Sequence, residues 1–414
     1  MNPRNFSKAA ATGSSRRGFL KHAGALVVGF RMAGGSRLAA QNPIDPTGLV
    51  DATQVDSWIS IGADESITAY SGKIEFGQGF STVQTQLIAE ELFVPLSRIK
   101  LVLGDTPVEQ GPAPAQTLAQ KYVADPTVVG VIGPSTSGAV AAASKTLTQA
   151  GILHISESAT RTTLTKGDNQ EAGSAFYRVV PADDIQGPTD AGYMMKTLKV
   201  KNVVVIDFQE PYSQGLAGAV ETALKAGGVT VTHLSIPNTV TDFSTFVTKV
   251  PSDADIVFFP TQKPGDAQAF AQQLAEQGKK AKVFGGDGSN DSTAFKAAGS
   301  YVSNFAPDIS GIAADKAIIA GWQKDNKGKT LGSFGPPTYG AVQVMLKAIK
   351  IACTHGHGTI AKRGAIVKDV RGVKIQNWIL GGSFKWSTIN VRDPANAKFY
   401  IFQIQSDGSY KLVG

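Results

Sequence analysis

The sequence has very little cysteine, since Cys353 is the single one among 414 residues. One thiol cannot form an internal disulfide, so the fold must be stabilised by its hydrophobic core. One thiolate is also too few to ligate an iron–sulfur cluster. His355 and His357 are two candidate metal ligands, but the sequence places no third ligand near them and a glycine follows each. We interpret this stretch as a solvated loop and expect no metal site.

Acidic residues are missing from the first 40 positions, which contain seven Lys and Arg residues. The rest of the chain has equal numbers of basic and acidic residues, 33 of each, so the net charge of +7 comes entirely from this segment. A nucleic-acid-binding domain needs a basic face on the folded protein. The charge distribution therefore indicates no nucleic-acid partner.

Long apolar runs are also lacking, whereas a membrane-spanning helix needs about 20 such residues. The apolar stretch 23–30 is too short, and it follows the run Ser15-Arg-Arg-Gly-Phe-Leu-Lys21. This arrangement resembles a twin-arginine export signal. We expect residues 1–40 to be such a signal, with cleavage after Ala40, and the protein to be periplasmic. A disordered basic tail is the alternative.

The sequence lacks the common catalytic signatures. It contains no nucleophile elbow, no paired His and Asp near a Ser, and no phosphate-binding lysine loop. We therefore expect a binding protein and not an enzyme.

The sequence does contain a set of apolar segments that end in glycine, hydroxyl or acidic residues. Residues 128–139, 155–160 and 283–288 have this form, and two more apolar segments, 203–208 and 255–260, alternate with helical patterns. In an open parallel sheet, the carboxyl ends of the strands present such side chains to a ligand. The pattern predicts an α/β fold with two ligand-facing half-sheets.

The order and spacing of these motifs resemble the branched-chain amino-acid-binding proteins of ABC importers from about residue 107 onward. The resemblance implies the type 1 periplasmic binding fold, with two doubly wound parallel-sheet lobes joined by a three-crossing hinge. It also implies a monomeric solute-binding protein that captures an amino acid, or a related small carboxylate, and delivers it to an ABC permease without a cofactor. A sensory binding module for amides or small acids is an alternative, because this fold serves several functions.

The resemblance assigns three ligand-binding residues to the first lobe. Ser137 is the hydroxyl ligand at the start of a helix, where backbone N–H groups favour a carboxylate. Ser158 occupies the position of a backbone-carbonyl ligand, and Thr160 that of a hydroxyl and amide ligand. Considered without the resemblance, each of these motifs is better explained as a helix cap.

Two more ligand-binding residues are assigned to the second lobe. Asp287, within Gly285-Gly-Asp-Gly288, matches the acidic ligand of an ammonium group, and Tyr212 matches a tyrosine that reaches the ligand. The alternatives are that Asp287 only satisfies its own glycine turn and that Tyr212 only covers the hinge. Thr261-Gln262 replaces an aromatic pair found in some relatives, so leucine cannot be assumed as the ligand.

Residues 56–106 have a different character. The segment 56–79 and the motifs that follow it resemble the opening of a molybdenum-hydroxylase large subunit, as in the isoquinoline oxidoreductase and aldehyde or xanthine oxidase families. In that family Gln78, within Gly77-Gln78-Gly79, would lie in the molybdopterin loop near the metal. The resemblance ends near Thr106, so the later pterin-binding loops have no counterpart and we expect no bound cofactor. A functionless remnant of such a subunit is the alternative for the whole chain.

This foreign segment has the order strand, helix, strand, which is also how a type 1 lobe begins. Residues 67–76 and 99–103 have strand patterns, and residues 82–92 have the pattern of an amphipathic helix. We hypothesise that this β-α-β unit completes the sheet of lobe one, with Leu87 and Leu101 buried against it. The alternative is an appendage beside an incomplete lobe.

The expected domain boundaries follow from these assignments. They are an export signal at 1–40, the molybdenum-hydroxylase-like segment at 41–106, lobe one at 107–180 and 307–385, and lobe two at 181–306 and 386–414.

Overall fold

The structure is a computed structural model, and the residues that it describes are 59–61, 67–70, 85–86, 88–89, 92, 94–102 and 111–414, except 327, 329, 359–361 and 396. The chain divides into two compact units, Met1–Glu109 and Gln110–Gly414. The expected export signal at residues 1–40 and the molybdopterin-loop residue Gln78 lie outside the described residues.

The first unit contains a three-stranded sheet in the order β1-β2-β3. Strand β1 (Ile59–Ile61) pairs antiparallel with β2 (Ile67–Tyr70), and β2 pairs in parallel with β3 (Ile99–Val102). A 3-10 turn, Leu96–Arg98, leads into β3. The parallel pairing of β2 with β3 is the one that a strand-helix-strand order requires.

This pairing adds a strand to the expected foreign unit. Among the described strands, β1, β2 and β3 form one sheet, and the first three strands of the second unit form another. Strand β1, which the sequence analysis did not include, occupies one edge of β2 while β3 occupies the other. The hypothesis that the segment completes the sheet of lobe one stays a prediction, because each unit is described by itself. Leu87 and the side chain of Leu101 lie outside the description.

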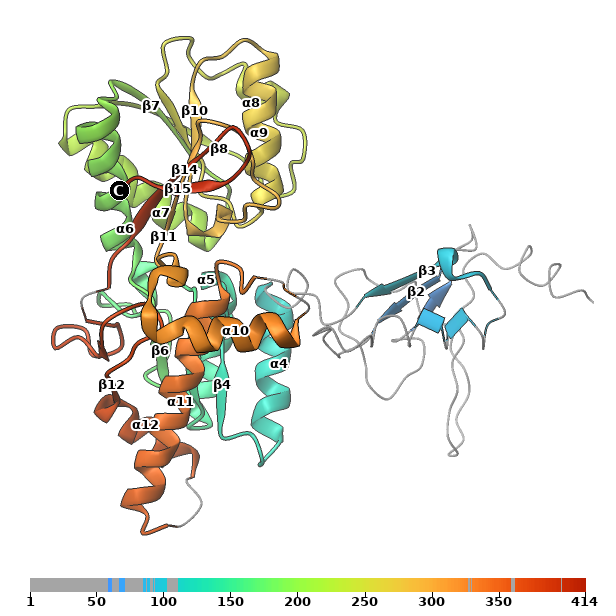
Figure 1. The fold of residues 1–414 in the computed structure, drawn as a ribbon, viewed down its shortest axis with the longest axis vertical. Helices are drawn as coiled ribbons and strands as arrows, with labels where there is room; N and C mark the ends of the chain where they lie inside the picture. Colours follow the sequence, from blue (N-terminus) through green and yellow to red (C-terminus); the bar gives the residue numbers. More distant parts are fainter. Residues whose placement is uncertain are drawn as a thin grey trace, which may run out of the picture. The chain divides into compact units, whose positions relative to one another are not determined.

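The second unit has two lobes, each built on one sheet (Figure 1). In lobe one the parallel strands follow the order β4-β5-β6. Alternate residues of these strands face opposite layers, so Val131 contacts one cluster and Ile132 another. The strands are β4 (Gly130–Ile132), β5 (Leu153–Ser156) and β6 (Phe176–Arg178).

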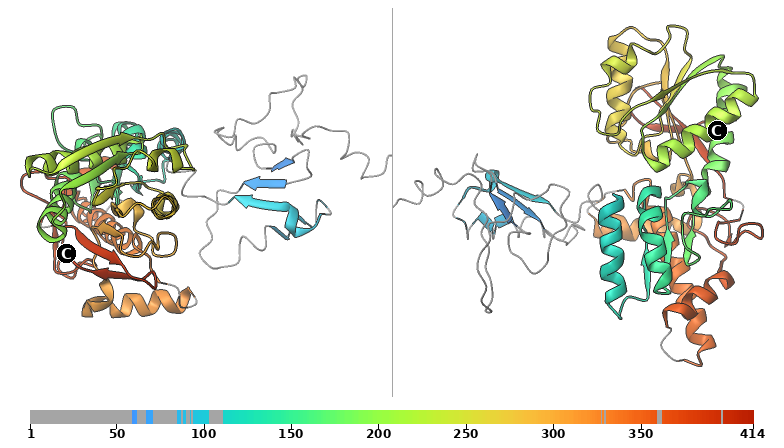
Figure 2. Two further views of the ribbon diagram at one scale, coloured as in Figure 1. Left: turned by 90° about the horizontal axis from the view of Figure 1, so that it is seen from above. Right: turned by 180° about the vertical axis from the view of Figure 1, so that it is seen from behind.

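Helices cover both faces of the lobe-one sheet (Figure 2). One layer is rich in alanine, which allows α4 and α5 to pack closely, and the other contains the long helix α11. The helices are α4 (Pro112–Ala124), α5 (Ser137–Gln149), α10 (Lys316–Asp325), α11 (Gly335–His355) and α12 (Arg363–Asp369). A two-stranded ribbon, β12 (Lys374–Ile375) and β13 (Phe384–Lys385), follows them.

Lobe two contains a seven-stranded sheet in the order β15-β14-β11-β10-β9-β7-β8. Val203 and Val205 face the layer of α6 and α7, whereas Val204 and Ile206 face the layer of α8 and α9. The strands are β7 (Asn202–Asp207), β8 (Thr230–Ser235), β9 (Ile256–Phe258), β10 (Lys282–Gly285), β11 (Tyr301–Asn304), β14 (Tyr400–Ile404) and β15 (Tyr410–Leu412). The helices are α6 (Asp183–Tyr193), continued by a π-helical turn at Met194–Leu198, α7 (Pro211–Ala226), α8 (Ser244–Val247) and α9 (Pro264–Glu276).

The lobe-two sheet is mixed, which refines the expectation of a purely parallel sheet. Strand β14 runs antiparallel to β11, and β15 runs antiparallel to β14. The β14–β15 hairpin turns at Asp407-Gly408, where Gly408 has a φ of 81°. An Asp-Gly turn of this kind favours a tight hairpin, because glycine adopts positive φ without strain.

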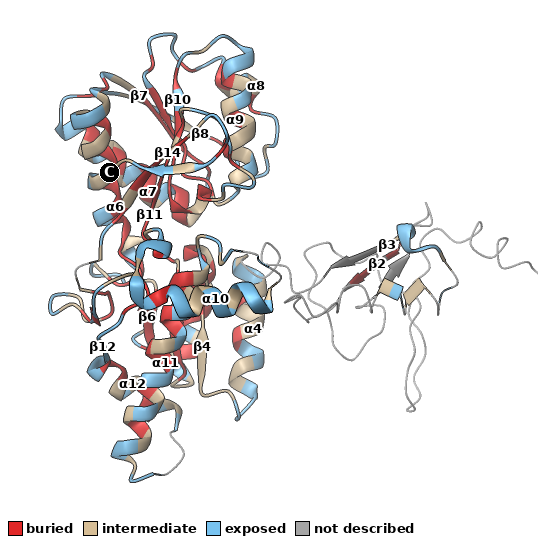
Figure 3. Cartoon of the chain, in the orientation of Figure 1, coloured by how far each residue is buried: buried red, intermediate tan, exposed pale blue. Residues whose placement is uncertain are grey.

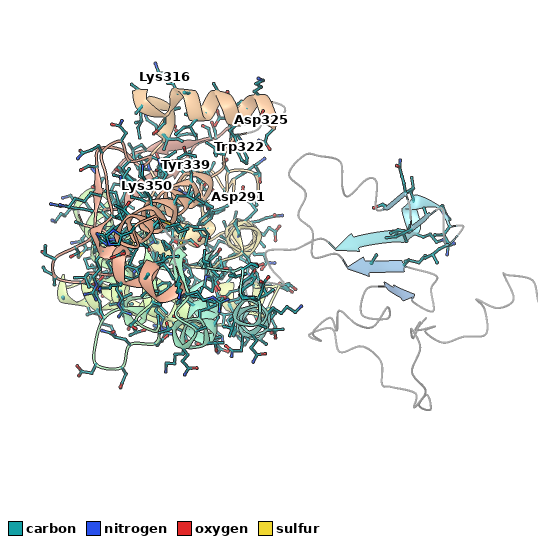
Figure 4. The ribbon with its side chains drawn as sticks, turned by 90° about the horizontal axis from the view of Figure 1, so that it is seen from below. Asp291, Lys316, Trp322, Asp325, Tyr339 and Lys350 are labelled. Carbon is teal, nitrogen blue, oxygen red and sulfur yellow. The ribbon has the colours of Figure 1, made fainter. Side chains whose placement is uncertain are left out.

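Strand β4 is one of the two edge strands of the lobe-one sheet, since among the described strands it pairs with β5 alone. Its three residues are half-buried, and the neighbouring helix α11 exposes Tyr339, Val342 and Leu346. Figure 4 shows Tyr339 and Lys350 on α11.

Buried residues concentrate in the strands and in the helix faces that pack against them (Figure 3). None of the described helices has the length and apolar character that a membrane crossing needs.

The chain passes between the lobes three times, after β6, after β11 and before β14. Arg178, at the end of β6, is fully buried and makes five hydrogen bonds, which match its five N–H donors. Two of these bonds go to the carboxylate of Asp393 in the third crossing, at 2.8 and 3.3 Å. Two others go to the carbonyl oxygens of Ala159 and Arg161. One side chain therefore ties β6, the loop after β5 and the third crossing together.

We predict that Arg178→Leu destabilises the protein strongly. The substitution removes the buried cation that is hydrogen-bonded to Asp393 and leaves this carboxylate only the ammonium group of Lys166 at 3.6 Å. Breaking a buried ion pair in this way costs about 3–5 kcal/mol. Chemical denaturation should measure this loss in the free energy of unfolding. Lys225→Ala is the control, because Lys225 is largely exposed and its ion pair with Glu221 contributes about 0–1 kcal/mol. Equal effects of the two substitutions would contradict the prediction.

Candidate functional site

The lobe-one half of the candidate site is built around the start of helix α5. The helix begins at Ser137, and its N-cap Thr136 accepts a hydrogen bond from the backbone N–H of Ala139 at 3.2 Å. The first N–H groups of a helix lack intrahelical acceptors and carry the positive end of its dipole. Ser137 is almost fully buried, and its hydroxyl oxygen accepts a bond from the N–H of Arg161 at 3.2 Å. The helix start is therefore fixed against the loop after β5.

That loop contains the other two residues predicted in lobe one. Ser158 is half-buried, and its hydroxyl donates to the carbonyl of Ser135 at 2.6 Å. Thr160 is fully buried, and its carbonyl accepts from the N–H of Asp183 at 2.9 Å. The Thr160 hydroxyl has no hydrogen bond of ordinary length to another described residue. It is thus a buried polar group at the place where the first crossing begins.

The lobe-two half consists of a tyrosine and a carboxylate that contact each other. Tyr212 lies in the first turn of α7, and Asp287 follows β10. The Tyr212 hydroxyl donates to Asp287 Oδ1 at 2.9 Å and accepts from the N–H of Gly288 at 3.1 Å. Both side chains are 2% exposed. The structure therefore joins two residues that are 75 positions apart in the sequence.

Glycines on both sides of Asp287 allow this contact. A Cβ atom at Gly286 would lie 2.4 Å from the Tyr212 hydroxyl and 2.7 Å from a methyl group of Leu216. A Cβ atom at Gly288 would lie 2.9 Å from the carbonyl oxygen of Thr261. Only glycine fits at such close approaches. The glycine-rich pattern around Asp287 is explained by this packing and not by positive φ.

Helix α6 adds acidic residues that the sequence analysis did not identify. Asp183, Gln186 and Asp190 are spaced three and four residues apart, so they share one face of the helix, and all three are buried. Ser303 of β11 donates to Asp190 at 2.9 Å and accepts from the amide of Gln186 at 2.9 Å. The polar residues at helical spacing could have indicated this buried face from the sequence. They were missed because acidic residues are common at the start of a helix, where they need no further explanation.

Burial raises the pKa of each carboxyl in this group. The pKa of Asp287 rises to about 6, with Tyr212 and Gln186 opposing the rise. The pKa of Asp183 rises to about 7 through burial and the negative charge of Asp287, while the nearby Thr160 hydroxyl and Arg178 oppose it. The pKa of Asp190 is raised well above its ordinary value, again mainly through burial. Desolvation without a cation disfavours the charged form.

The two halves meet where helix α5 of lobe one contacts helix α7 of lobe two. A Cβ atom at Gly138 would lie 3.4 Å from the ring of Pro211, the first residue of α7. A Cβ atom at Gly215 would lie 3.2 Å from Asp183 and 3.3 Å from Arg161. The approach is tight at Gly215 and is an ordinary van der Waals contact at Gly138, and it brings the start of α5 close to the start of α7.

The molybdopterin loop suggested by the opening segment cannot be compared with the structure. Gln78 and its glycines lie outside the described residues, so the structure provides no test of a molybdopterin loop. Within the described ranges, no group of three or more His, Cys, Asp or Glu residues is arranged to bind a metal ion. We derive no chemistry from such a cofactor.

Two family models match the chain. Residues 98–409 match a periplasmic binding protein family, and residues 7–120 match a molybdopterin cofactor-binding domain. The second match agrees with the resemblance seen in the opening segment. It covers a minor part of the chain, and it overlaps the first match at residues 98–120.

Curated relatives have names that refer to amino-acid binding. The chain is 33% identical over 193 residues to the Leu/Ile/Val-binding protein BraC3 of Rhizobium johnstonii, covering 46% of this chain and 50% of that protein. It is 30% identical to Leu/Ile/Val-binding protein homolog 1 of Brucella abortus, covering 64% of this chain and 70% of that protein. The match thus spans about half of the first relative and more of the second.

Solved structures have the same fold at low sequence identity. A leucine-binding protein of Thermotoga maritima superposes with a TM-score of 0.66 at 19% identity, covering 84% of this chain and 97% of that one. A branched-chain amino-acid transporter substrate-binding protein of Streptococcus pneumoniae, in complex with isoleucine, gives a TM-score of 0.64 at 22% identity, covering 84% and 98%. These likenesses show the type 1 periplasmic binding fold. Because the family match extends over most of its length, the chain belongs to the periplasmic binding protein family.

Proposed function

We propose that this protein is the solute-binding component of an ABC importer and captures an amino acid between its two lobes. Ser137 and Thr160, with the N–H groups at the start of α5, bind the ligand carboxylate. The carbonyl of Ser158, together with Asp287 and Tyr212, binds the ligand ammonium group. The closed protein, acting as a periplasmic monomer, then delivers the ligand to a permease. The lobe boundaries are those expected from the sequence, 107–180 with 307–385 and 181–306 with 386–414.

The observation that carries this proposal is the carboxylate of Asp287. It is almost fully buried, and among the described residues no Lys, Arg or His forms an ion pair with it. A desolvated carboxylate is stable as an anion only when a cation compensates it. The ammonium group of an amino acid is such a cation, and it would arrive with the carboxylate that the opposite lobe is built to accept.

Asp183 strengthens the negative side of the site. Neither of its carboxylate oxygens has a hydrogen bond of ordinary length among the described residues. Its position beside Thr160 places it at the boundary between the two halves. Because its pKa is about 7, Asp183 is about half ionised at neutral pH, and its ionised form adds negative charge beside Asp287 that favours a cationic ligand group.

The relatives support a small carboxylate ligand but differ in its kind. The names of several refer to leucine, isoleucine and valine. One solved neighbour is a solute-binding protein of R. palustris in complex with benzoate, which has no ammonium group. The buried Asp287 favours an amino acid over a simple acid for the present chain, because benzoate would leave this carboxylate uncompensated.

We predict that Asp287→Asn weakens amino-acid binding by about thirty- to several-thousand-fold, or about 2–5 kcal/mol. The isosteric amide keeps an acceptor for Tyr212 but loses the negative charge. Asp291→Asn is the matched control, because the Asp291 carboxylate only accepts bonds from Thr293 in a local turn. Titration calorimetry with a panel of amino acids and benzoate measures both variants. A loss below threefold for Asp287→Asn would show that this residue is only part of a turn.

We also predict that the affinity falls at acidic pH. The ammonium ligand binds the ionised form of Asp287, whose pKa in the free protein is raised to about 6. Affinity should be nearly constant above pH 7 and fall about tenfold for each unit below pH 6. Binding near pH 6 should release protons, which calorimetry in buffers of different ionisation enthalpy detects. An affinity that rises on acidification would contradict the prediction.

Export is proposed to depend on the paired arginines of the opening segment. Arg16→Lys together with Arg17→Lys should retain the protein in the cytoplasm, because a twin-arginine signal is read by its two arginines. Cell fractionation and immunoblotting measure the distribution. Arg4→Lys is the control, since it lies outside the pair. Undiminished export of the double variant would show that the basic segment is not a twin-arginine signal.

A further inference from the structure

Glu157 is a buried carboxyl that the amino-acid backbone site does not use. It lies between Ser156 and Ser158 in the loop after β5 and is 7% exposed. Its Oε1 accepts a short hydrogen bond from the hydroxyl of Ser135, in the loop before α5. Its Oε2 is buried and has no hydrogen-bond partner among the described residues. One half of this carboxyl is therefore satisfied and the other half is not.

The environment of Glu157 contains no cation that would explain its burial. None of the ion pairs between described residues includes it, and burial raises its pKa, opposed by the Ser135 hydroxyl and its own backbone N–H. A carboxylate with a structural role looks different, as Asp393 shows by accepting from Arg178 with both oxygens. An unsatisfied buried acceptor is costly, and such groups are retained where a ligand supplies the missing donor.

The position of Glu157 is on the lobe-one wall of the proposed site. Ser135, which donates to it, also accepts from Ser158 through its carbonyl, so the loops before α5 and after β5 are joined at this point. Ser137 and Thr160 lie two and three residues away along these loops. Glu157 is thus within the same two loops that hold the ligand carboxylate.

Glu157 is nevertheless separate from the ammonium-binding carboxyls. Glu157 is hydrogen-bonded to Ser135 of lobe one, whereas Asp190 and Asp287 are hydrogen-bonded to Ser303 and Tyr212 of lobe two. The unsatisfied oxygen of Glu157 thus belongs to the opposite lobe from these carboxyls, where we infer that it meets a different part of the ligand. For an amino acid, the remaining part is its side chain.

Lobe two has a similar group at the start of α7. Glu210 directly precedes Pro211, the residue that lies against Gly138 of α5. Its Oε1 is also buried without a hydrogen-bond partner among the described residues. Burial raises the pKa of Glu210 to about 7, opposed by the N–H of Gln262 and by Lys263. Each lobe therefore has a buried carboxyl oxygen without a hydrogen-bond partner among the described residues, close in sequence to the residues proposed to bind the ligand.

We propose that Glu157 selects an amino acid whose side chain ends in N–H donors, that is, an amide or a cationic amino acid, over a branched-chain one. This inference rests on the proposed function and specifies its ligand class. A site built to accept a hydrogen bond rejects an analogue without the donor, because the buried acceptor is then left unpaired. Leucine, isoleucine and valine carry no side-chain donor.

The test compares the full-length protein with Glu157→Gln and Glu157→Leu by titration calorimetry. The probes are glutamine, arginine, lysine, glutamate and leucine. We expect the unmodified protein to bind at least one of the first three at least tenfold more tightly than leucine or glutamate. Glu157→Leu should reduce that preference at least tenfold while changing leucine affinity less than threefold. Glu276→Gln, an exposed substitution on α9, is the control and should change nothing.

The possible failures are distinguishable. Leucine binding as tightly as the donor ligands, with a ratio that Glu157→Leu leaves unchanged, would overturn the inference and leave the proposed function intact. Absence of binding by every amino acid tested would overturn both. If thermal melting shows that Glu157→Leu does not fold, the isosteric Glu157→Gln decides. The amide of Glu157→Gln, unlike a carboxylate, can also donate a hydrogen bond to ligands that lack N–H donors. The preference of this variant for arginine and lysine should therefore fall at least tenfold, and an unchanged preference would contradict the proposal.

Discussion

The buried guanidinium of Arg178 is the interaction on which the arrangement of the second unit depends. Its five donors are all used, and they fix the third crossing through Asp393 and the loop after β5 through two carbonyl oxygens. Those carbonyls belong to Ala159 and Arg161, the two neighbours of Thr160. Thr160 is thus held in place through its two neighbours by Arg178, which also holds the third crossing through Asp393. Hinge geometry and site geometry are consequences of one interaction.

The sequence predicted the parts of the fold that repeat a simple pattern. Strand β7 occupies Asn202–Asp207, where alternating burial of valines toward two helix layers requires a strand buried on both faces. The antiparallel pairing of β14 with β15 and the ribbon β12–β13 were not predicted, because β12, β13 and β15 are only two or three residues long. Strand β1 of the first unit was missed for a related reason. Three residues of β1 are too few to show a period, yet they occupy the edge of β2.

The candidate site could be predicted only where a motif marked it. The turn around Asp287 and the hydroxyls after β4 and β5 are visible as glycine-rich or hydroxyl-rich strand ends. The acidic face of α6 is not visible in this way, because its burial results from packing against α7 and β11. Glu157 is a similar case, since a glutamate between two serines looks solvated until the tertiary structure encloses it. Burial of a charge is a tertiary property, so sequence patterns alone do not reveal it.

These buried carboxyls have a consequence for stability as well as for binding. A carboxyl whose pKa is raised on folding stabilises the folded state below its unfolded pKa of about 4, and this contribution is lost as the pH rises through the folded value. For Asp287 and Asp183 the pKa values in the folded protein are about 6 and about 7. At neutral pH, ionisation of these buried carboxyls in the empty site therefore lowers the free energy of unfolding. A cation that binds there removes that cost and stabilises the folded protein by mass action. In the proposed site, the burial that favours a cationic ligand group would therefore also couple ligand capture to folding stability.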